Sequence, residues 1–410
     1  MSTNPYKLTR FLYPVDEVQY SLITSLVKKE NIDACYYWAF ELYYSGLENH
    51  LFDLFFKIHY DFYAERNPKL EHYIVNKRKK WMEDKDIRHV AFIVKNLFIA
   101  TPTPTVFLMR QYINSSGHPS HVYNAASGSS ISHINFTAEY KNLCMAISYG
   151  RLANIAYDIN RLVKRDGSDV VREVIIDHFR IEFGGFIDRG REKLDKAWNE
   201  RVIFDDIHLL LAMIVHLMVD DDKINTRSVF GTPLQENIDE ILEIENTVIE
   251  KKYRTLCFKR KWKTCDLIGS FELARHHSLS KFIEDNWFHW EYYASGVPLW
   301  CKRIQDYNGI INHDKRELVF HDEEMEEQFR EQYGYELDEQ PKEVQDLSLH
   351  NIMSTSWKLW FYNIFGHNRE LSVIDALTDD FSKIHINNSS PDLDILSIVK
   401  NIPTEYKIIY

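Results

Sequence analysis

The residues with the richest chemistry lie in a basic and aromatic stretch, 251–263 (KKYRTLCFKRKWK). It holds seven cationic and three aromatic side chains in 13 residues. Cationic groups bind phosphates and aromatic rings stack on bases, so this composition is typical of a nucleic-acid contact. On a helix, Lys252, Lys259 and Lys263 would share one face. The residues predicted to contact nucleic acid are Lys252, Arg254, Lys259, Arg260, Lys261, Trp262 and Lys263.

Two other interpretations of this stretch stay open. Cations are favoured at the C-terminal end of a helix, because the helix dipole is negative there, so the stretch would also suit a plain solvated surface. It would equally suit an acidic protein partner, or the acidic segment of the chain itself. That segment, residues 322–346, contains eleven acids against Arg330 and Lys342. A shorter basic cluster, residues 77–80, precedes Trp81 and has the same alternatives.

Signatures of catalysis are missing from the sequence. It contains no Walker A motif, no G-x-G-x-x-G, no H-E-x-x-H, no G-x-S-x-G and no C-x-x-C pair. We therefore predict no catalytic residue. An enzyme with a dispersed site stays an alternative, and it would need a deep pocket in which acids and histidines converge.

Three groups of histidines and cysteines have the chemistry of metal ligands without the spacing of a metal site. His289, Glu291 and Cys301 are similar to part of the zinc-deaminase pattern, which requires a second cysteine ligand. The other two groups are three loop histidines and a Cys₂His₂ set with the wrong spacing for a zinc finger. They consist of His118, His121 and His133, and of Cys257, Cys265, His276 and His277. We predict no metal and no cofactor.

Aromatic residues are unusually frequent, at 14% of the chain, and they are consecutive in residues 35–44 and 287–296. Consecutive rings on one helix cannot all face a single core. We therefore predict that the surplus rings form a docking surface for a protein partner. The predicted interface residues are Tyr36, Tyr37, Trp38, Tyr43, Tyr44, Trp287, Trp290 and Tyr293.

Composition indicates a folded, mainly helical protein. Hydrophobic residues make up 45% of the 410 residues, while only 14 are Gly and 11 are Pro, which disfavours turn-rich β folds. The net charge of −12 argues against a protein that coats nucleic acid with its whole surface. Five scattered cysteines indicate a reducing compartment and predict a cytoplasmic location. The longest apolar run, residues 207–219, is too short to span a bilayer and is predicted to be a buried helix.

The order of breakers and apolar residues predicts a helical array or bundle in two lobes. Asn31 is a predicted helix N-cap, and Gly46 suits the left-handed position after that helix. Residues 47–63 carry two apolar stripes and so need helices on both sides. A later helix from about residue 233 is predicted to carry an apolar face made of Ile238, Ile241, Leu242, Val248 and Ile249.

The predicted regions follow these breakers along the chain. A helical lobe of residues 1–113 is followed by a Ser/Gly/His loop of residues 114–135. A second helical lobe covers residues 136–300. The C-terminal region, residues 301–410, contains a small β-hairpin near residues 309–320, the acidic segment and a last helix.

Three stretches carry a resemblance to known proteins: ELYYSGLENHLFDLFFKIHYDFYAERNPKL (41–70), YYASGVPLWCKRI (292–304) and EQYGYELDEQPKEVQ (331–345). Together they resemble a family of uncharacterised proteins from large nucleocytoplasmic DNA viruses. The resemblance implies a product made in the host cytoplasm that acts in the viral factory or is packaged in the particle. It implies no activity and no catalytic residue.

The leading hypothesis from the sequence is a non-enzymatic scaffold or adaptor that binds proteins through its aromatic-rich helix faces. The alternatives are a nucleic-acid-binding factor that uses residues 251–263, and an enzyme without a recognisable motif. The adaptor hypothesis rests on the surplus aromatic rings forming docking surface. Buried rings together with a wet cleft of converging titratable groups elsewhere would favour an enzyme instead.

Overall fold

A computed structural model describes residues 6–114, 137–183, 206–219, 230–265 and 279–348, together with residues 360–361 and 364–365. Within these ranges the chain is helical apart from one two-stranded hairpin, which confirms the predicted mainly α fold. Except for Asn114, the predicted loop of residues 114–135 lies outside the described residues, as do His276 and His277. None of the described helices is long and apolar enough to cross a membrane.

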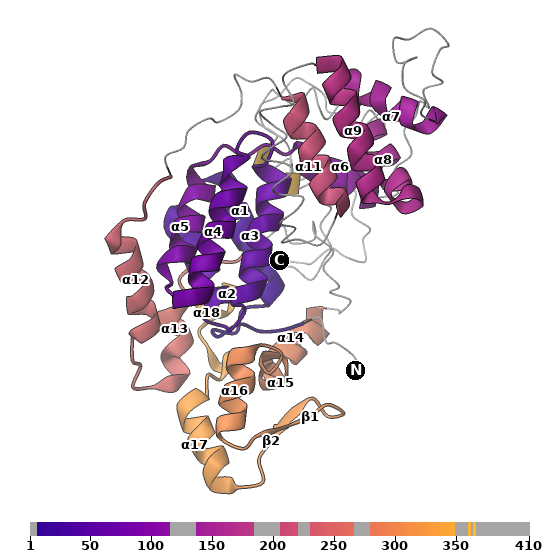
Figure 1. The fold of residues 1–410 in the computed structure, drawn as a ribbon. Helices are drawn as coiled ribbons and strands as arrows, with labels where there is room; N and C mark the ends of the chain where they lie inside the picture. The colour runs from indigo at the N-terminus through magenta and orange to yellow at the C-terminus, as the bar shows by residue number, and fades with distance from the viewer. Residues whose placement is uncertain are drawn as a thin grey trace, which may run out of the picture.

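Five helices form the N-terminal bundle (Figure 1). They are α1 (Val15–Lys28), α2 (Ile32–Tyr43), α3 (Glu48–Phe62), α4 (Lys69–Asp84) and α5 (Arg88–Ile99). The Asn31 side chain accepts a hydrogen bond from the Asp33 N–H, which confirms the predicted N-cap of α2. Gly46 has a φ of +81°, a conformation that favours glycine, as predicted for the turn after this helix.

Helix α3 lies between other helices, as its two apolar stripes predict. One stripe buries Leu51 and Phe55 and the other buries Phe52 and Phe56. The helix contacts α2 and α4 on the bundle side and α6 (Thr105–Asn114) and α11 (Asp206–Met218) on the other side. It therefore joins the N-terminal bundle to the next group of helices.

That next group contains α6 and α11 together with α7 (Ala138–Ser148), α8 (Leu152–Asp166) and α9 (Ser168–Phe183). Helix α11 contacts α3, α6, α8 and α9. Because it has neighbours on all sides, every residue from 208 to 217 is buried, including His208 and His216. This matches the prediction that the apolar run of residues 207–219 is a buried helix.

The remaining elements pack below the bundle or along its outer edge (Figure 1). They are α12 (Gln235–Asn246), η3 (Lys252–Arg254), α13 (Thr255–Lys259), α14 (Leu279–Phe288), α15 (Trp290–Ala294), α16 (Pro298–Asp306), β1 (Ile310–Asn312), β2 (Glu317–Val319), α17 (Glu323–Tyr333), η5 (Leu337–Glu339) and α18 (Lys342–Gln345). The antiparallel pairing of Ile310 with Val319 confirms the predicted hairpin.

The predicted lobe of residues 136–300 is divided between two places. Helices α8 and α11 pack with α6, and α7 and α9 pack with α8. In contrast, α12 packs on α2 through Ile238 and Ile241. Helices α14 to α16 lie beside the hairpin and α17, below the bundle (Figure 1). The predicted lobe is divided because α12 packs on apolar surface of the N-terminal bundle. The sequence pattern does not predict this contact.

The N-terminal segment, residues 6–14, connects these parts. The Leu8 N–H donates to the Tyr293 carbonyl at 3.3 Å, and the Trp300 indole N–H donates to the Thr9 carbonyl at 3.0 Å. Leu8, Leu12 and Tyr13 are fully buried. The segment therefore lies in a core shared by α2, residues 254–265 and α16.

Candidate functional site

Most of the aromatic residues predicted as a docking surface lie in the core, which corrects that prediction. Buried members are Tyr36, Tyr37, Trp38, Tyr43, Trp290 and Tyr293, and Tyr44 and Trp287 are partly buried. The reason is that α2 has neighbours on every side, because it contacts α1, α3, α5 and α12. Consecutive rings on one helix therefore all find packing partners inside the protein.

Two tyrosine hydroxyls of α2, those of Tyr37 and Tyr43, form internal hydrogen bonds. The Tyr37 hydroxyl donates to the Lys259 carbonyl at 3.0 Å, and the Tyr43 hydroxyl donates to the Lys85 carbonyl at 3.3 Å. The Trp81 indole N–H donates to the Tyr43 hydroxyl. Burial raises the pKa of Tyr37 well above its ordinary value. These hydroxyls stay neutral and act as structural hydrogen-bonding groups.

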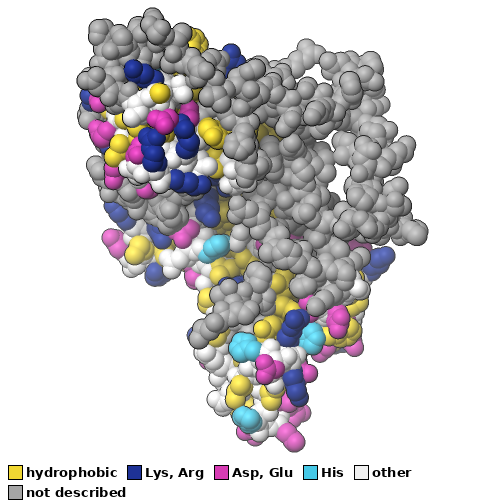
Figure 2. All heavy atoms as spheres, turned by 90° about the vertical axis from the view of Figure 1, so that its right-hand side faces the viewer, with side chains coloured by type: hydrophobic (Ala, Val, Ile, Leu, Met, Phe, Trp, Pro, Cys, Tyr) yellow, Lys and Arg dark blue, Asp and Glu magenta, His cyan; other side chains and the backbone are white. Residues whose placement is uncertain are grey.

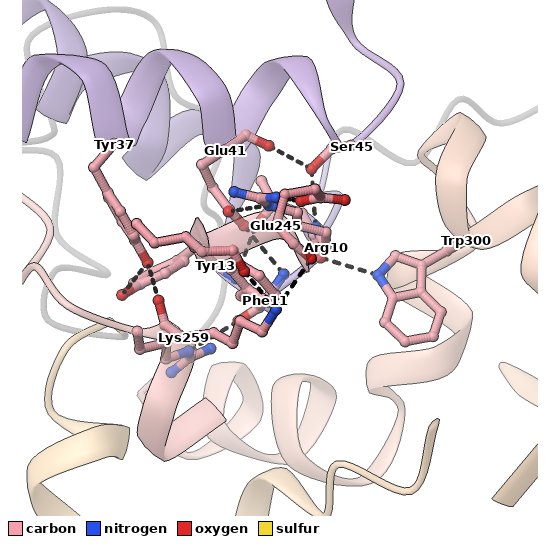
Figure 3. Close-up of polar contacts among 12 residues, drawn as sticks. Arg10, Phe11, Tyr13, Tyr37, Glu41, Ser45, Glu245, Lys259 and Trp300 are labelled. Atoms are coloured by element: carbon pink, nitrogen blue, oxygen red, sulfur yellow. Dashed lines mark hydrogen bonds and ion pairs between the residues drawn. The ribbon is translucent and has the colours of Figure 1, made fainter. Parts of the chain in front are cut away.

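Two residues of the basic stretch, Lys259 and Arg260, donate hydrogen bonds to groups of the chain itself. Figure 3 shows Lys259 beside Tyr13 and Phe11 of the N-terminal segment. Arg260 is buried and donates to the carbonyls of Phe11 at 2.8 Å, Leu12 at 2.7 Å and Val344 at 3.2 Å. The Lys259 amine donates to the last carbonyls of α12, those of residues 244 and 245. Because both side chains are enclosed, the prediction that Lys259 and Arg260 contact nucleic acid is wrong.

Arg10 is a third buried cation, and together with Lys259 and Arg260 it forms a junction of buried cations. Its guanidinium pairs with Glu41 at 2.8 Å and with Glu245 of α12. Lys259 lies close enough that burial, followed by the charges of Arg10, Arg303 and Lys252, lowers its pKa to about 8. The hollow beside Arg10, between α2 and α12, has a volume of about 20 Å³, which is roughly the space of one water. The junction is thus closed by the protein's own carboxylates and carbonyls.

The other predicted contacts of the basic stretch are spread over a mixed surface. Arg254, Lys261 and Lys263 are exposed, and Lys252 and Trp262 are partly exposed. Lys261 pairs with Glu240 of α12 at 3.2 Å. An acid of α12 therefore pairs with Lys261, although α12 is not the acidic segment of residues 322–346 that the prediction named.

A surface that sequence reasoning missed is the α12–α13 arm, residues 234–258, at the outer edge of the bundle (Figure 1). Helix α12 ends at Asn246 because Thr247 takes an extended conformation, so Val248 leaves the predicted helix face and is 83% exposed. Other large apolar side chains on the arm are also exposed: Leu234 at 61%, Leu242 at 37%, Tyr253 at 46% and Phe258 at 60%.

The exposed charges of the arm are mainly negative. The acids are Glu236, Asp239, Glu240, Glu243, Glu245 and Glu250, and the fully exposed cations are Lys251 and Arg254. On the face of the molecule shown in Figure 2, the described side chains of both signs are interspersed. Neither the α12–α13 arm nor the described part of the face in Figure 2 presents the continuous positive charge that binding of a nucleic-acid backbone requires.

A buried titratable cluster joins α3, α6 and α11. Arg110 donates to both carboxylate oxygens of Asp61, at 3.0 and 2.7 Å, and the His208 ring lies 2.8 Å from the same carboxylate. Burial alone would raise the pKa of Asp61, but Arg110 and His208 hold it well below the ordinary value. Both oxygens of Asp61 are thus engaged in the ion pair. Acids and histidines converge here, but as an internal ion-pair network.

One group of described side chains has the spacing of metal ligands. Ligand atoms of Asp84, Asp86 and His89, at the turn between α4 and α5, lie within 4.8 Å of one another. His89 is 2.9 Å from the Asp84 carboxylate, and Arg88 donates to Asp86 at 2.6 Å. The Arg88 guanidinium already supplies the positive charge that a cation would bring. We assign these contacts to the turn and not to a metal.

The described residues thus define a mainly helical protein in which the buried charges of Arg10 and Asp61 are paired with the protein's own groups. Comparisons with models of known families, with curated proteins and with solved structures find no match. The resemblance to viral proteins therefore stays a prediction.

Proposed function

We propose that this protein is a non-enzymatic adaptor whose docking surface is the α12–α13 arm. One observation carries the proposal: five large apolar side chains are exposed within the 25 residues 234–258. Exposed apolar surface of this density is typical of protein-binding sites. The proposal keeps the predicted adaptor function. It assigns docking to the α12–α13 arm and not to the aromatic helices, whose rings are mostly buried.

The proposed occupant is a basic amphipathic segment of a protein partner. Apolar side chains of that segment would cover Val248, Tyr253 and Phe258, and its lysines or arginines would face the acids of α12. Nucleic acid is disfavoured as the occupant, because the arm exposes six acids against Lys251 and Arg254. Full burial of a side chain such as Phe258 contributes roughly 1.5–3 kcal/mol.

We further propose that binding takes place in the cytoplasm or a similar reducing compartment. All five cysteines are free thiols, and Cys35 and Cys144 are buried in the core. Free thiols persist where glutathione keeps them reduced. This compartment agrees with the one that the viral resemblance implies.

The test separates apolar docking from simple attraction of opposite charges. The probe is a dye-labelled synthetic helix of leucines and lysines, titrated with the full chain and followed by fluorescence anisotropy. The variant V248E/F258E removes two exposed apolar groups and adds two negative charges. Docking through the arm predicts at least tenfold weaker binding, although attraction to lysines increases.

The matched control is V170E/I310E, which adds the same charges at residues that are 50% and 49% exposed elsewhere. It is expected to bind the probe at least as tightly as the unaltered chain. If V248E/F258E also binds as tightly as the unaltered chain, the arm is not the docking surface. Affinity capture from a lysate with the same variants then identifies partners that depend on the arm.

A further inference from the structure

The segment that leads into the α12–α13 arm is held against the N-terminal bundle by residues of α4 and α5. The Gly231 N–H donates to the Asn96 side-chain oxygen at 2.7 Å, and the Asn96 amide N–H donates to the Gly231 carbonyl at 2.9 Å. The Phe230 ring stacks on the Tyr73 ring, with the centroids 4.0 Å apart and the planes inclined by 22°. These four residues are called the Phe-Gly clip below.

The bundle side of the Phe-Gly clip is rigidly built. Asn96 is only 2% exposed, and its amide also donates to the Phe92 carbonyl at 2.8 Å and to the Tyr73 hydroxyl at 3.2 Å. A buried amide that is fixed in this way offers one donor and one acceptor to a passing backbone. A Cβ at Gly231 would lie 3.0 Å from the Ile99 Cδ1, so the close approach favours glycine. The clip therefore suits an aromatic residue followed by glycine.

The start of α12 depends on tertiary contacts of this kind, because it has no cap of its own. The N-cap residue is Leu234, whose apolar side chain forms no capping hydrogen bond. The free N–H groups of a first helical turn are usually stabilised by a polar N-cap side chain. The next contact along the chain is the Asn237 amide, which donates to Asp33 of α2 at 3.1 Å. The Phe-Gly clip and Asn237 thus place the first turn of α12 from either side of Leu234.

The far end of the arm is fastened to the bundle by the junction of buried cations. Glu245, near the end of α12, pairs with Arg10. The Lys259 amine, which follows the arm directly, donates to the carbonyls of residues 244 and 245. The exposed apolar side chains of the arm, from Leu234 to Phe258, therefore lie between two fastenings.

We propose that the Phe-Gly clip positions the α12–α13 arm for its partner, so that closure of the clip and docking on the arm favour each other. This inference rests on the docking function proposed for the arm. An arm that is already fixed at both ends loses less conformational freedom on binding, so a closed clip raises the affinity. By thermodynamic linkage, a bound partner stabilises the closed clip by the same factor. Tyr73 and Asn96 are thus positioning residues that act through Phe230 and Gly231.

Hydrogen exchange of the full chain tests the clip itself. F230A removes the stacked ring, and N96L removes both hydrogen bonds to Gly231. Each variant is expected to accelerate exchange of the Gly231 N–H by about tenfold, which is the typical effect of losing one aromatic pair or one hydrogen bond. The control F288A removes a ring that is 65% exposed on α14 and should leave this exchange unchanged. If F230A and N96L exchange like F288A, the clip does not hold the segment and the inference is wrong.

The dye-labelled helix of leucines and lysines tests the coupling to the arm. F230A/N96L opens the clip without changing residues 234–258, and it is expected to bind this probe about fivefold more weakly or worse, the lower end of typical coupling. F230Y keeps the stacked ring and should bind like the unaltered chain. In the unaltered chain, saturating probe should slow exchange of the Gly231 N–H by the same factor as the loss of affinity. A purely structural role of the clip would not produce this slowing.

The outcomes separate this inference from the proposed function. If F230A/N96L binds the probe as tightly as the unaltered chain, or if saturating probe leaves the Gly231 exchange unchanged, the clip does not position the arm. Both results leave the adaptor proposal intact, because V248E/F258E tests different residues. If V248E/F258E binds like the unaltered chain, the arm is not the docking surface and both proposals fail. Circular dichroism checks that each variant is folded.

Discussion

Replacement of Arg260 by methionine tests the structural role of the basic stretch. Methionine keeps an unbranched chain in the core but removes the guanidinium that donates to the Phe11 and Leu12 carbonyls at 2.8 and 2.7 Å. A hydrogen bond from a charged group contributes about 1.5–3 kcal/mol, and both carbonyls would stay buried without a partner. We therefore expect the N-terminal segment to lose about 3–5 kcal/mol of local stability.

Hydrogen exchange followed by mass spectrometry measures this loss directly. The N–H groups of Leu8, Thr9 and Leu12 are hydrogen-bonded to backbone carbonyls and report the opening of the segment. Since each 1.4 kcal/mol is a factor of ten, their exchange should accelerate by about two to three and a half orders of magnitude. Local exchange is the suitable assay, because a chain of this size does not unfold in two states.

The matched control is R254M, six residues earlier in the same stretch. Arg254 is exposed, and surface substitutions usually change stability by less than about 0.5 kcal/mol, which is roughly a twofold change in exchange. If R260M leaves the exchange of residues 8–12 unchanged, or if R254M accelerates it equally, Arg260 does not hold the segment.

Two further perturbations have outcomes set by local geometry. Alanine at Gly46 would place a Cβ 2.7 Å from the Pro298 Cβ at a φ of +81°, whereas Gly167 has a φ of +87° and open space. G46A should therefore lower the melting temperature more than G167A, and equal losses would exclude the clash. Burial, then His208 and His216, lower the pKa of His59 from 6.5 to about 3, so the unfolded state binds its proton first. The free energy of unfolding is therefore highest above pH 6.5 and falls by about 2 kcal/mol from pH 7 to pH 5. H59L should reduce this fall in thermal melts recorded at several pH values, and an unchanged fall would contradict the assignment to His59.

Features fixed by neighbouring residues could be predicted from the sequence. Asn31 is an N-cap because its short side chain reaches an N–H two residues later. The paired strands at residues 310–319 follow from two β-favouring runs around a turn. The two stripes of α3 correctly predict neighbours on both sides, because helical periodicity is a local property.

Features that depend on distant contacts could not be predicted. The partner of the Tyr37 hydroxyl is 222 residues away, and the Leu12 carbonyl that binds Arg260 is 248 residues away. Sequence spacing shows that the rings of α2 need more than one neighbour, but not whether that neighbour is internal. The exposure of Val248 could not be predicted either, because it follows from the end of α12 at Asn246.

The contacts of the polar clusters bear on the proposed adaptor function. A catalytic acid or base must exchange a proton with a substrate, so it needs an open position beside it. Asp61 has both oxygens on Arg110 and His208, and Lys259 donates to the last carbonyls of α12. In contrast, the arm exposes five large apolar side chains. The contrast between these exposed side chains and the paired groups of Asp61 and Lys259 supports the proposed adaptor function.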